Sequence, residues 1–172
     1  MKQGTMTLLS CAAVLATGFA APARAEDVIT MHRLSAALAS EAVTEAVAAC
    51  AKQGYKITAT IIDIDGVVQA TLRGDGAMLT TVDAAHDKAY TALMLGAARG
   101  EAGSGDVAKR MGPTQTPGGL AKLPHILLAQ GALNIRVGNE PIGAIGVGGA
   151  PGGDLDEACA KAGLNKISAR LK

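Results

Sequence analysis

The chain has 172 residues, of which 49% are hydrophobic and 18% are charged, and its net charge is +1. This balance excludes a strongly basic protein that binds nucleic acid or an anionic membrane through bulk charge. Aromatic residues make up 2% of the chain, so the core must consist of Ala, Val, Ile and Leu, which bury little area per residue. We therefore expect a homo-oligomer, in which subunit association supplements the stability of one domain.

The first 25 residues are predicted to be a cleavable signal peptide. Lys2 gives a positive start, Met6–Ala21 is apolar, and Ala23-Arg24-Ala25 is the small-x-small pattern that a signal peptidase cleaves. The apolar run is short for a membrane span. Residues 26–172 then form a single domain with a net charge of −1, because two basic residues leave and no acidic one does. This predicts a periplasmic or extracellular protein with no stable membrane span.

Of the three cysteines, Cys50 and Cys159 fall in the predicted domain, on the apolar sides of predicted helices. An exported protein meets oxidising conditions, so the two can form a disulfide if their helices are neighbours. Two buried free thiols are an equally favoured alternative, since a sequence does not give the Cα separation. Cys11 lies in the leader, where a lipoprotein signal is a less favoured alternative.

The predicted domain begins with a helix over 36–53, which Ser35 caps and Gly54 ends. A β-hairpin comes next, over Ile57–Arg73. Two runs of alternating residues flank Asp65-Gly66, a pair that favours a two-residue turn with positive φ at both positions. The alternation predicts that one face of the hairpin is buried.

A second helix is predicted over 81–98, with Thr80 as its N-cap and Asp83 in its first turn. One apolar stripe at helical spacing predicts which residues face the sheet: Val82, His86, Ala89 and Leu93. The polar residues Asp83, Asp87, Lys88 and Thr91 are expected to point elsewhere.

From Arg99 to Pro124, glycine and proline break the pattern, with room for a short helix over 106–111. A connection of this length is usually functional or mobile, and we expect it to form the wall of a site. Three further strands are predicted at Ile126–Ala129, Leu133–Val137 and Pro141–Val147, before a glycine-rich turn and a last helix capped by Asp154. The hairpin links predict an α+β fold, in which a five-stranded antiparallel sheet is flanked by helices.

Three segments carry a specific pattern: the hairpin turn Ile62–Gly66, the D-x-A-x-x-K-A-x-T-A helix over Asp83–Ala92, and the GAIGVxG strand over Gly143–Gly149. Together they resemble the GlcG/HbpS family of haem-binding, so-called haem-degrading proteins, over nearly all of Thr30–Lys172. The resemblance implies a profilin- or PAS-like sandwich that is oligomeric and, in some members, exported and haem-binding. Function varies more than fold in such a family.

Haem needs an axial ligand with a free lone pair, apolar walls and cations for its propionates. His86 is the first candidate for the metal ligand of a haem b, because the helical pattern places it on an apolar side, and His125 is the second. Arg73 and Tyr90 complete the candidate cofactor-binding set. A core histidine held by a backbone carbonyl or an aspartate is the alternative for His86.

The predicted function is thus haem capture, storage or redox sensing. A haem-degrading or peroxidase-like enzyme is one alternative, and a haem-free module that binds another small ligand or stabilises a partner is the other. The glycine-rich turn over Gly146–Pro151 does not fit a dinucleotide-binding loop, because proline stands where the third glycine belongs.

Overall fold

The computed structural model describes residues 29–112 and 119–172. Residues 31–172 form one unit, while residues 29 and 30 belong to another, in which they form neither helix nor strand. The predicted signal peptide at 1–25 lies outside the described residues. Within the part of the chain that is described, no helix is both long and apolar enough to cross a membrane.

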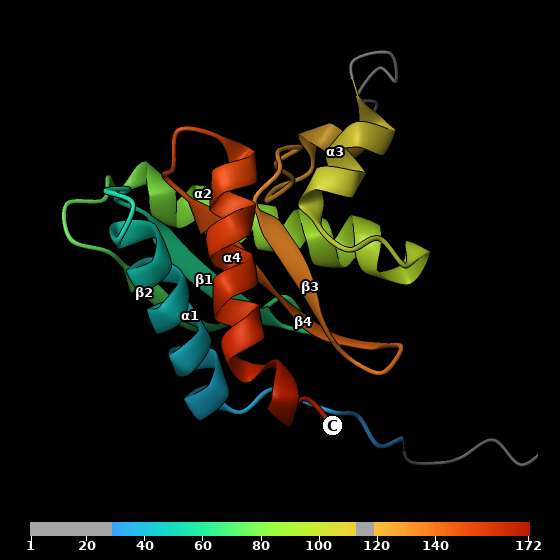
Figure 1. The fold of residues 1–172 in the computed structure, drawn as a ribbon. Helices are drawn as coiled ribbons and strands as arrows, with labels where there is room; N and C mark the ends of the chain where they lie inside the picture. Colours follow the sequence, from blue (N-terminus) through green and yellow to red (C-terminus); the bar gives the residue numbers. More distant parts are fainter. Residues whose placement is uncertain (1–28, 113–118) are drawn as a thin grey trace, which may run out of the picture. The chain divides into compact units, whose positions relative to one another are not determined.

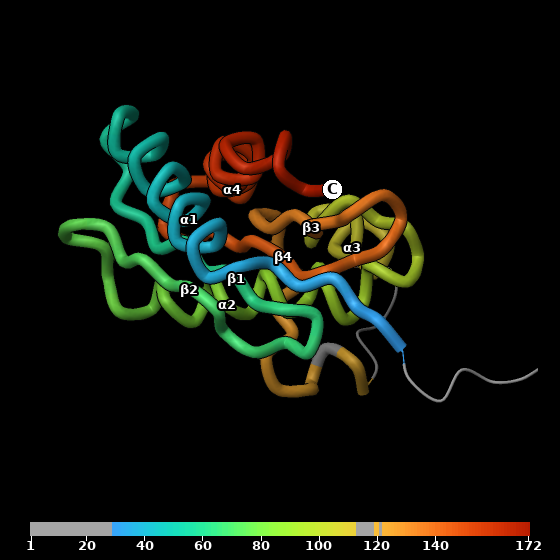
Figure 2. Tube along the Cα trace, turned by 90° about the horizontal axis from the view of Figure 1, so that it is seen from below, coloured from blue at the N-terminus to red at the C-terminus, as the bar shows by residue number. Residues whose placement is uncertain are grey.

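Helices cover both faces of a sheet in the unit over 31–172 (Figure 1). In chain order the elements are α1 (Ala36–Ala51), β1 (Thr58–Asp63), β2 (Val68–Arg73), α2 (Thr80–Thr91), α3 (Ser104–Met111), β3 (Ala132–Val137), β4 (Glu140–Gly148) and α4 (Gly153–Ile167). A π-helical turn over Ala92–Gly96 and a 3-10 turn over Ala97–Arg99 extend α2. Figure 2 shows α1 and α4 side by side on one face, with α2 on the other.

The sheet is antiparallel and has four strands in the order β2-β1-β4-β3, so the predicted fifth strand is wrong. Ile126–Ala129 forms no ladder, and the backbone N–H of Leu127 instead donates to Thr91 Oγ1 on α2. A short apolar run fits a strand and a buried loop equally well, which is why the pattern misleads here. Ala102 and Gly103 cover part of the free edge of β3 in its place.

The β1–β2 hairpin is confirmed, but its loop spans four residues, Ile64–Val67. Gly66 has a φ of +80°, whereas Asp65 does not have a positive φ. Asp63 Oδ1 accepts hydrogen bonds from the backbone N–H groups of Asp65 and Val67, each at 3.0 Å. The Asp63 side chain therefore stabilises a longer turn, in place of the tight Asp65-Gly66 turn that the sequence pattern predicts.

Strand β1 is buried on both faces and not on one, because α1 and α4 cover one side of the sheet and α2 covers the other. Two glycines of β4 allow α2 to approach closely. A Cβ at Gly146 would overlap the carbonyl oxygen of Ala85 and stand 2.8 Å from the backbone nitrogen of Ala89, and one at Gly148 would stand 2.9 Å from Ala84 Cβ. Glycine at these positions sets the distance between α2 and the sheet.

Replacing Gly146 with alanine is expected to destabilise the protein by at least about 2 kcal/mol, because the added methyl group meets backbone atoms that cannot rotate away. Chemical denaturation followed by circular dichroism measures the loss. Gly119→Ala is the control, since a Cβ there meets nothing within 4 Å. Equal stability of the two variants would contradict the close approach of α2 to β4.

A disulfide joins Cys50 of α1 to Cys159 of α4, which settles the alternative left open by the sequence. The Cα atoms are 5.7 Å apart, and both cysteines are buried. Gly163 allows the two helices to meet, since a Cβ there would overlap the carbonyl oxygen of Ala42. Helix α4 continues through Gly163 and ends at Ile167. Its N-cap is Gly152, whereas the sequence predicts Asp154.

Candidate functional site

Helix α2 carries the candidate site, but its buried face differs from the predicted one. The buried residues are Thr81, Ala85, Lys88, Ala89 and Thr91. His86 does not face the sheet but lies beside the buried stripe, with 22% of its side chain exposed. The prediction that Lys88 and Thr91 point away from the core is also wrong. Because α2 is rich in alanine, several of its faces look equally apolar, and the pattern does not fix its rotation.

Two histidines meet at one carboxylate on this side of α2. Asp87 Oδ1 lies 2.9 Å from His86 Nδ1 and 3.0 Å from His125 Nδ1. Nitrogen or oxygen atoms of the three side chains all lie within 4.8 Å of one another. The His86 and Asp87 side chains are about three-quarters buried, whereas 56% of His125 is exposed. The cluster is therefore anchored on the helix and open to solvent at His125.

Asp87 determines which imidazole nitrogens are free. A carboxylate accepts hydrogen bonds, so in the neutral rings each Nδ1 that contacts Asp87 carries the proton and each Nε2 keeps its lone pair. A hydrogen bond of this kind fixes the tautomer and the orientation of a metal-binding histidine and raises its basicity. The arrangement leaves two Nε2 atoms with the electronic state that an iron ligand needs.

Tyr90 lies one turn after His86, and its ring lies near both imidazoles. Its ring centroid is 6.0 Å from that of His86 and 5.7 Å from that of His125, and the two imidazole centroids are 4.9 Å apart. Three of the four predicted cofactor-binding side chains thus converge, although His86 and His125 are 39 positions apart in the sequence.

The backbone holds His125 in an unusual conformation. His125 has a φ of +66°, and it is the one non-glycine residue with a positive φ among residues 29–112 and 119–172. Such a conformation costs on the order of 1–3 kcal/mol and persists where surrounding contacts hold it. The hydrogen bond of 2.8 Å from Leu127 N to Thr91 Oγ1 ties the segment after His125 to α2. The fold therefore holds the backbone segment that presents the second imidazole.

Arg73, the fourth predicted cofactor-binding residue, lies elsewhere. It ends β2, an edge strand, and its guanidinium donates a hydrogen bond to the backbone carbonyl of Ala77. This contact links the end of β2 to the chain that leads into α2.

A buried ion pair that the sequence did not predict lies on the opposite side of α2. Lys88 Nζ donates to Asp156 Oδ2 at 2.6 Å, and the two side chains are 8% and 3% exposed. Asp156 Oδ1 also accepts from the backbone N–H of Ala150 at 2.9 Å. The D-x-A-x-x-K motif contains Lys88, but its partner comes after a glycine-rich turn, 68 positions later. The ion pair and the hydrogen bond to Ala150 link α4, and the glycine-rich turn before it, to α2.

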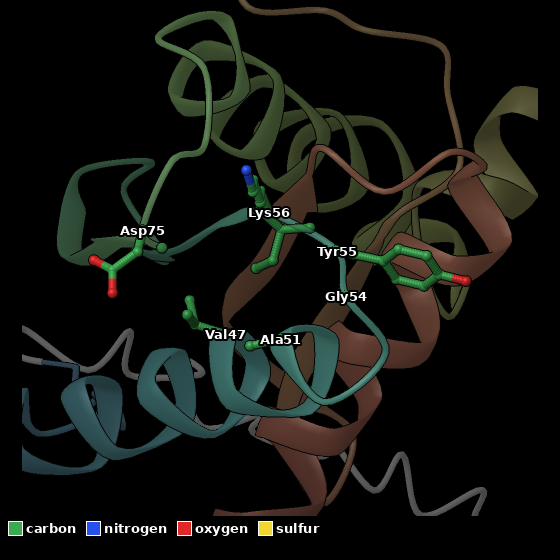
Figure 3. Close-up of a pocket in the computed structure, with 8 residues that line it drawn as sticks. Val47, Ala51, Gly54, Tyr55, Lys56 and Asp75 are labelled. Atoms are coloured by element: carbon green, nitrogen blue, oxygen red, sulfur yellow. The ribbon is translucent and has the colours of Figure 1, made fainter.

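A separate hollow of about 300 Å³ opens on the other face of the sheet, between α1 and the chain that enters β1 (Figure 3). Val47 and Ala51 line it from α1, while Lys56 and Asp75 lie across from them, and the Tyr55 ring points away toward one side. None of its lining residues is a histidine. It therefore lacks the imidazole that haem iron binds, and we place the candidate site at the histidine cluster.

The third histidine, His32, forms a simpler pair. Its Nδ1 lies 2.6 Å from Glu140 Oε2, and both side chains are exposed. The hydrogen bond from His32 holds the pKa of Glu140 below its usual value. This pair contains one imidazole and one carboxylate, and it provides a natural comparison for the cluster on α2.

Comparison with known proteins gives a family match and solved structures of the same fold. A protein family described as haem-degrading and HbpS-like matches residues 34–165. HbpS from Streptomyces reticuli, solved as a double mutant, is 35% identical, with a TM-score of 0.73 over 83% of this chain and 92% of that one. A second HbpS structure is 34% identical, with a TM-score of 0.72 over 83% and 96%.

More distant structures share the fold alone. The PduOC:heme complex is 21% identical, with a TM-score of 0.69 over 79% of this chain and 96% of that one. No curated protein matches the chain. The matched range of the family, residues 34–165, includes both histidines of the cluster, Asp87 and the buried ion pair.

Proposed function

We propose, because this chain belongs to the HbpS-like family of haem-degrading proteins, that it is an exported haem-binding protein that captures, stores or senses haem. The observation that carries the proposal is the pair of imidazoles on Asp87, within the region that matches the family. The PduOC neighbour, solved in complex with heme, supports haem as the ligand class.

The imidazoles of the cluster, and exposed apolar side chains that precede His125 in the chain, support such a ligand. His86 is the proposed axial ligand of haem b through Nε2, with His125 as the second candidate and Tyr90 beside both rings. Leu120 and Leu123 precede His125 in the chain and are 50% and 51% exposed, so they offer apolar surface to a porphyrin. When bound, the iron would supply reversible ligand and electron chemistry, and the protein would tune it through the axial imidazole and its hydrogen bond.

Replacing His86 with alanine is expected to weaken hemin binding at least about tenfold and to change the Soret band, because the proposed iron ligand is lost. Titration of the untagged protein with hemin, monitored by absorption, measures both effects. His32→Ala is the matched control, since it removes an imidazole from the exposed pair with Glu140. A Soret band that is unchanged in His86→Ala would remove His86 from the site, and parallel titration of His125→Ala would then test the second candidate.

A haem-degrading enzyme is the second candidate function, and the description of the matched family favours it. The two functions differ in the fate of the bound haem. Hemin is added with ascorbate under air, and the Soret band is monitored over time. A stable band supports capture, storage or sensing, whereas loss of the band with release of iron supports degradation. A protein that gives no Soret change at all would be the haem-free module that binds another small ligand or a partner.

Export is part of the proposal, and two features support it. The first 25 residues read as a cleavable signal peptide, and the Cys50–Cys159 disulfide is typical of a protein that folds in an oxidising compartment. Mass spectrometry of protein from a periplasmic extract tests the proposal, because cleavage after Ala25 gives a chain that starts at Glu26. An intact N-terminus in the cytoplasmic fraction would contradict it.

Self-association is also proposed, and light scattering of the mature chain measures it. The exposed edge strand β2 supports it, since Val68 and Leu72 are 48% and 36% exposed there. A monomer at the concentrations of the hemin titration would contradict this part of the proposal.

A further inference from the structure

The cluster on α2 has the composition of a site for a single metal ion. It combines two imidazoles with one carboxylate, His86, His125 and Asp87, and this ligand set is typical of non-haem sites for divalent first-row transition metals. Oxygen-only sites suit Mg²⁺ and Ca²⁺, while imidazole nitrogen favours Zn²⁺, Fe²⁺, Ni²⁺ and Cu²⁺. The donor set thus specifies the class of ion.

The donor atoms have the spacing of one coordination shell. A ligand nitrogen or oxygen lies about 2.0–2.2 Å from such an ion, so neighbouring ligands of one ion are about 2.8–3.6 Å apart, from octahedral to tetrahedral angles. The two Nδ1 atoms lie 2.9 and 3.0 Å from Asp87 Oδ1, and nitrogen or oxygen atoms of all three side chains lie within 4.8 Å of one another. An ion can take the place of the two Nδ1 protons with little movement of the side chains.

The fold prepares this arrangement before any ion arrives. His86 and Asp87 are adjacent on α2, and about three-quarters of each side chain is buried. His125 comes from a different segment and keeps a positive φ of +66° while the Leu127–Thr91 hydrogen bond holds the next residues. The 56% exposure of His125 leaves one side open for entry of an ion and for water as a further ligand.

We propose that His86, Asp87 and His125 form a binding site for a divalent transition-metal ion, held through the two Nδ1 atoms and a carboxylate oxygen. This inference goes beyond haem binding, which we assign to Nε2, and stands whether or not hemin binds. Binding of the ion moves the proton of each neutral imidazole from Nδ1 to Nε2 by exchange with solvent, so the ion and haem are alternative ligands of His86, and no oxidation state changes.

The test uses Co²⁺ and Zn²⁺ with the untagged protein and no haem. We expect isothermal titration with Zn²⁺ to give one site per chain, and Co²⁺ to give visible d–d absorption that reports nitrogen ligation. His86→Ala and His125→Ala are each expected to weaken binding at least about 10–100-fold, because each removes one of three protein ligands. Asp87→Asn is expected to weaken binding less, since the amide oxygen remains a neutral ligand.

His32→Ala is again the matched control, because it removes an imidazole that also bonds a carboxylate but has no second imidazole beside it. Circular dichroism of each variant shows whether the fold is kept. Co²⁺ affinity that is equal in the wild type and in the His86→Ala/His125→Ala double variant overturns the proposal, as does an equal loss in His32→Ala. A failed hemin titration with intact Co²⁺ binding would reject the haem proposal alone.

Discussion

Replacing Asp156 with alanine is expected to lower the free energy of unfolding by about 3–5 kcal/mol, the cost of leaving one member of a buried ion pair without its partner. Lys88 and Asp156 are 8% and 3% exposed, and their charged atoms are 2.6 Å apart. The variant also leaves the backbone N–H of Ala150 without its acceptor. Urea denaturation at pH 7 measures the change.

Asp154→Ala is the control for this experiment, because Asp154 lies in the same helical turn but is exposed. It is expected to cost less than about 1 kcal/mol, mainly through the helix dipole. The double variant Lys88→Met/Asp156→Leu should recover part of the loss, since a buried ion pair replaced by apolar groups of similar volume is often near neutral. Equal unfolding curves for Asp156→Ala and Asp154→Ala would show that the ion pair contributes nothing to stability.

Loss of the disulfide is the second large effect that we expect. The double variant Cys50→Ala/Cys159→Ala should be about 2–5 kcal/mol less stable than the wild type, because the bridge constrains a long segment of the unfolded chain. For a domain of this size the loss corresponds to a fall in Tm of about 5–15 °C. Differential scanning calorimetry measures it.

A reductant provides the internal control for the disulfide. Dithiothreitol should lower the Tm of the wild type toward that of the double variant and leave the double variant unchanged. A wild-type Tm that does not respond to complete reduction, verified by thiol titration, would contradict the prediction. The α1–α4 contact would then owe its stability to packing around residues such as Gly163 and Ala42.

The fold was largely predictable because its strongest signals are local. Ser35 accepts a hydrogen bond from Leu38 N as the predicted helix N-cap, and a short turn at Gly138-Asn139 joins β3 to β4 in a hairpin, the kind of link that the sequence predicts between these two strands. The prediction of a fifth strand at Ile126–Ala129 was wrong because this segment pairs with no strand. Its backbone N–H at Leu127 instead donates to the Thr91 side chain on α2. A contact of that kind has no signature in a single sequence.

The candidate site was predictable in its residue types but not in its arrangement. The sequence singles out His86, His125 and Tyr90, yet it does not show that Asp87 joins the two imidazoles. The helical pattern puts Lys88 on the solvent face, where lysine usually lies, whereas the structure buries it against a partner on another helix. Asp87 and His125 are 38 positions apart, and Lys88 and Asp156 are 68 positions apart, so both pairs depend on tertiary packing. The helical pattern of an alanine-rich segment does not determine that packing.

The covalent bond between Cys50 and Cys159 encloses the strands and both histidines of the α2 cluster within one closed ring of the polypeptide. A protease that cuts the backbone once inside that ring produces two pieces that remain linked by sulfur. The nicked molecule keeps its mass apart from one added water, and it migrates as a single species until a thiol is added. Export, as proposed above, would expose the chain to proteases, and the disulfide would keep both histidines of the cluster in one molecule after a single cleavage.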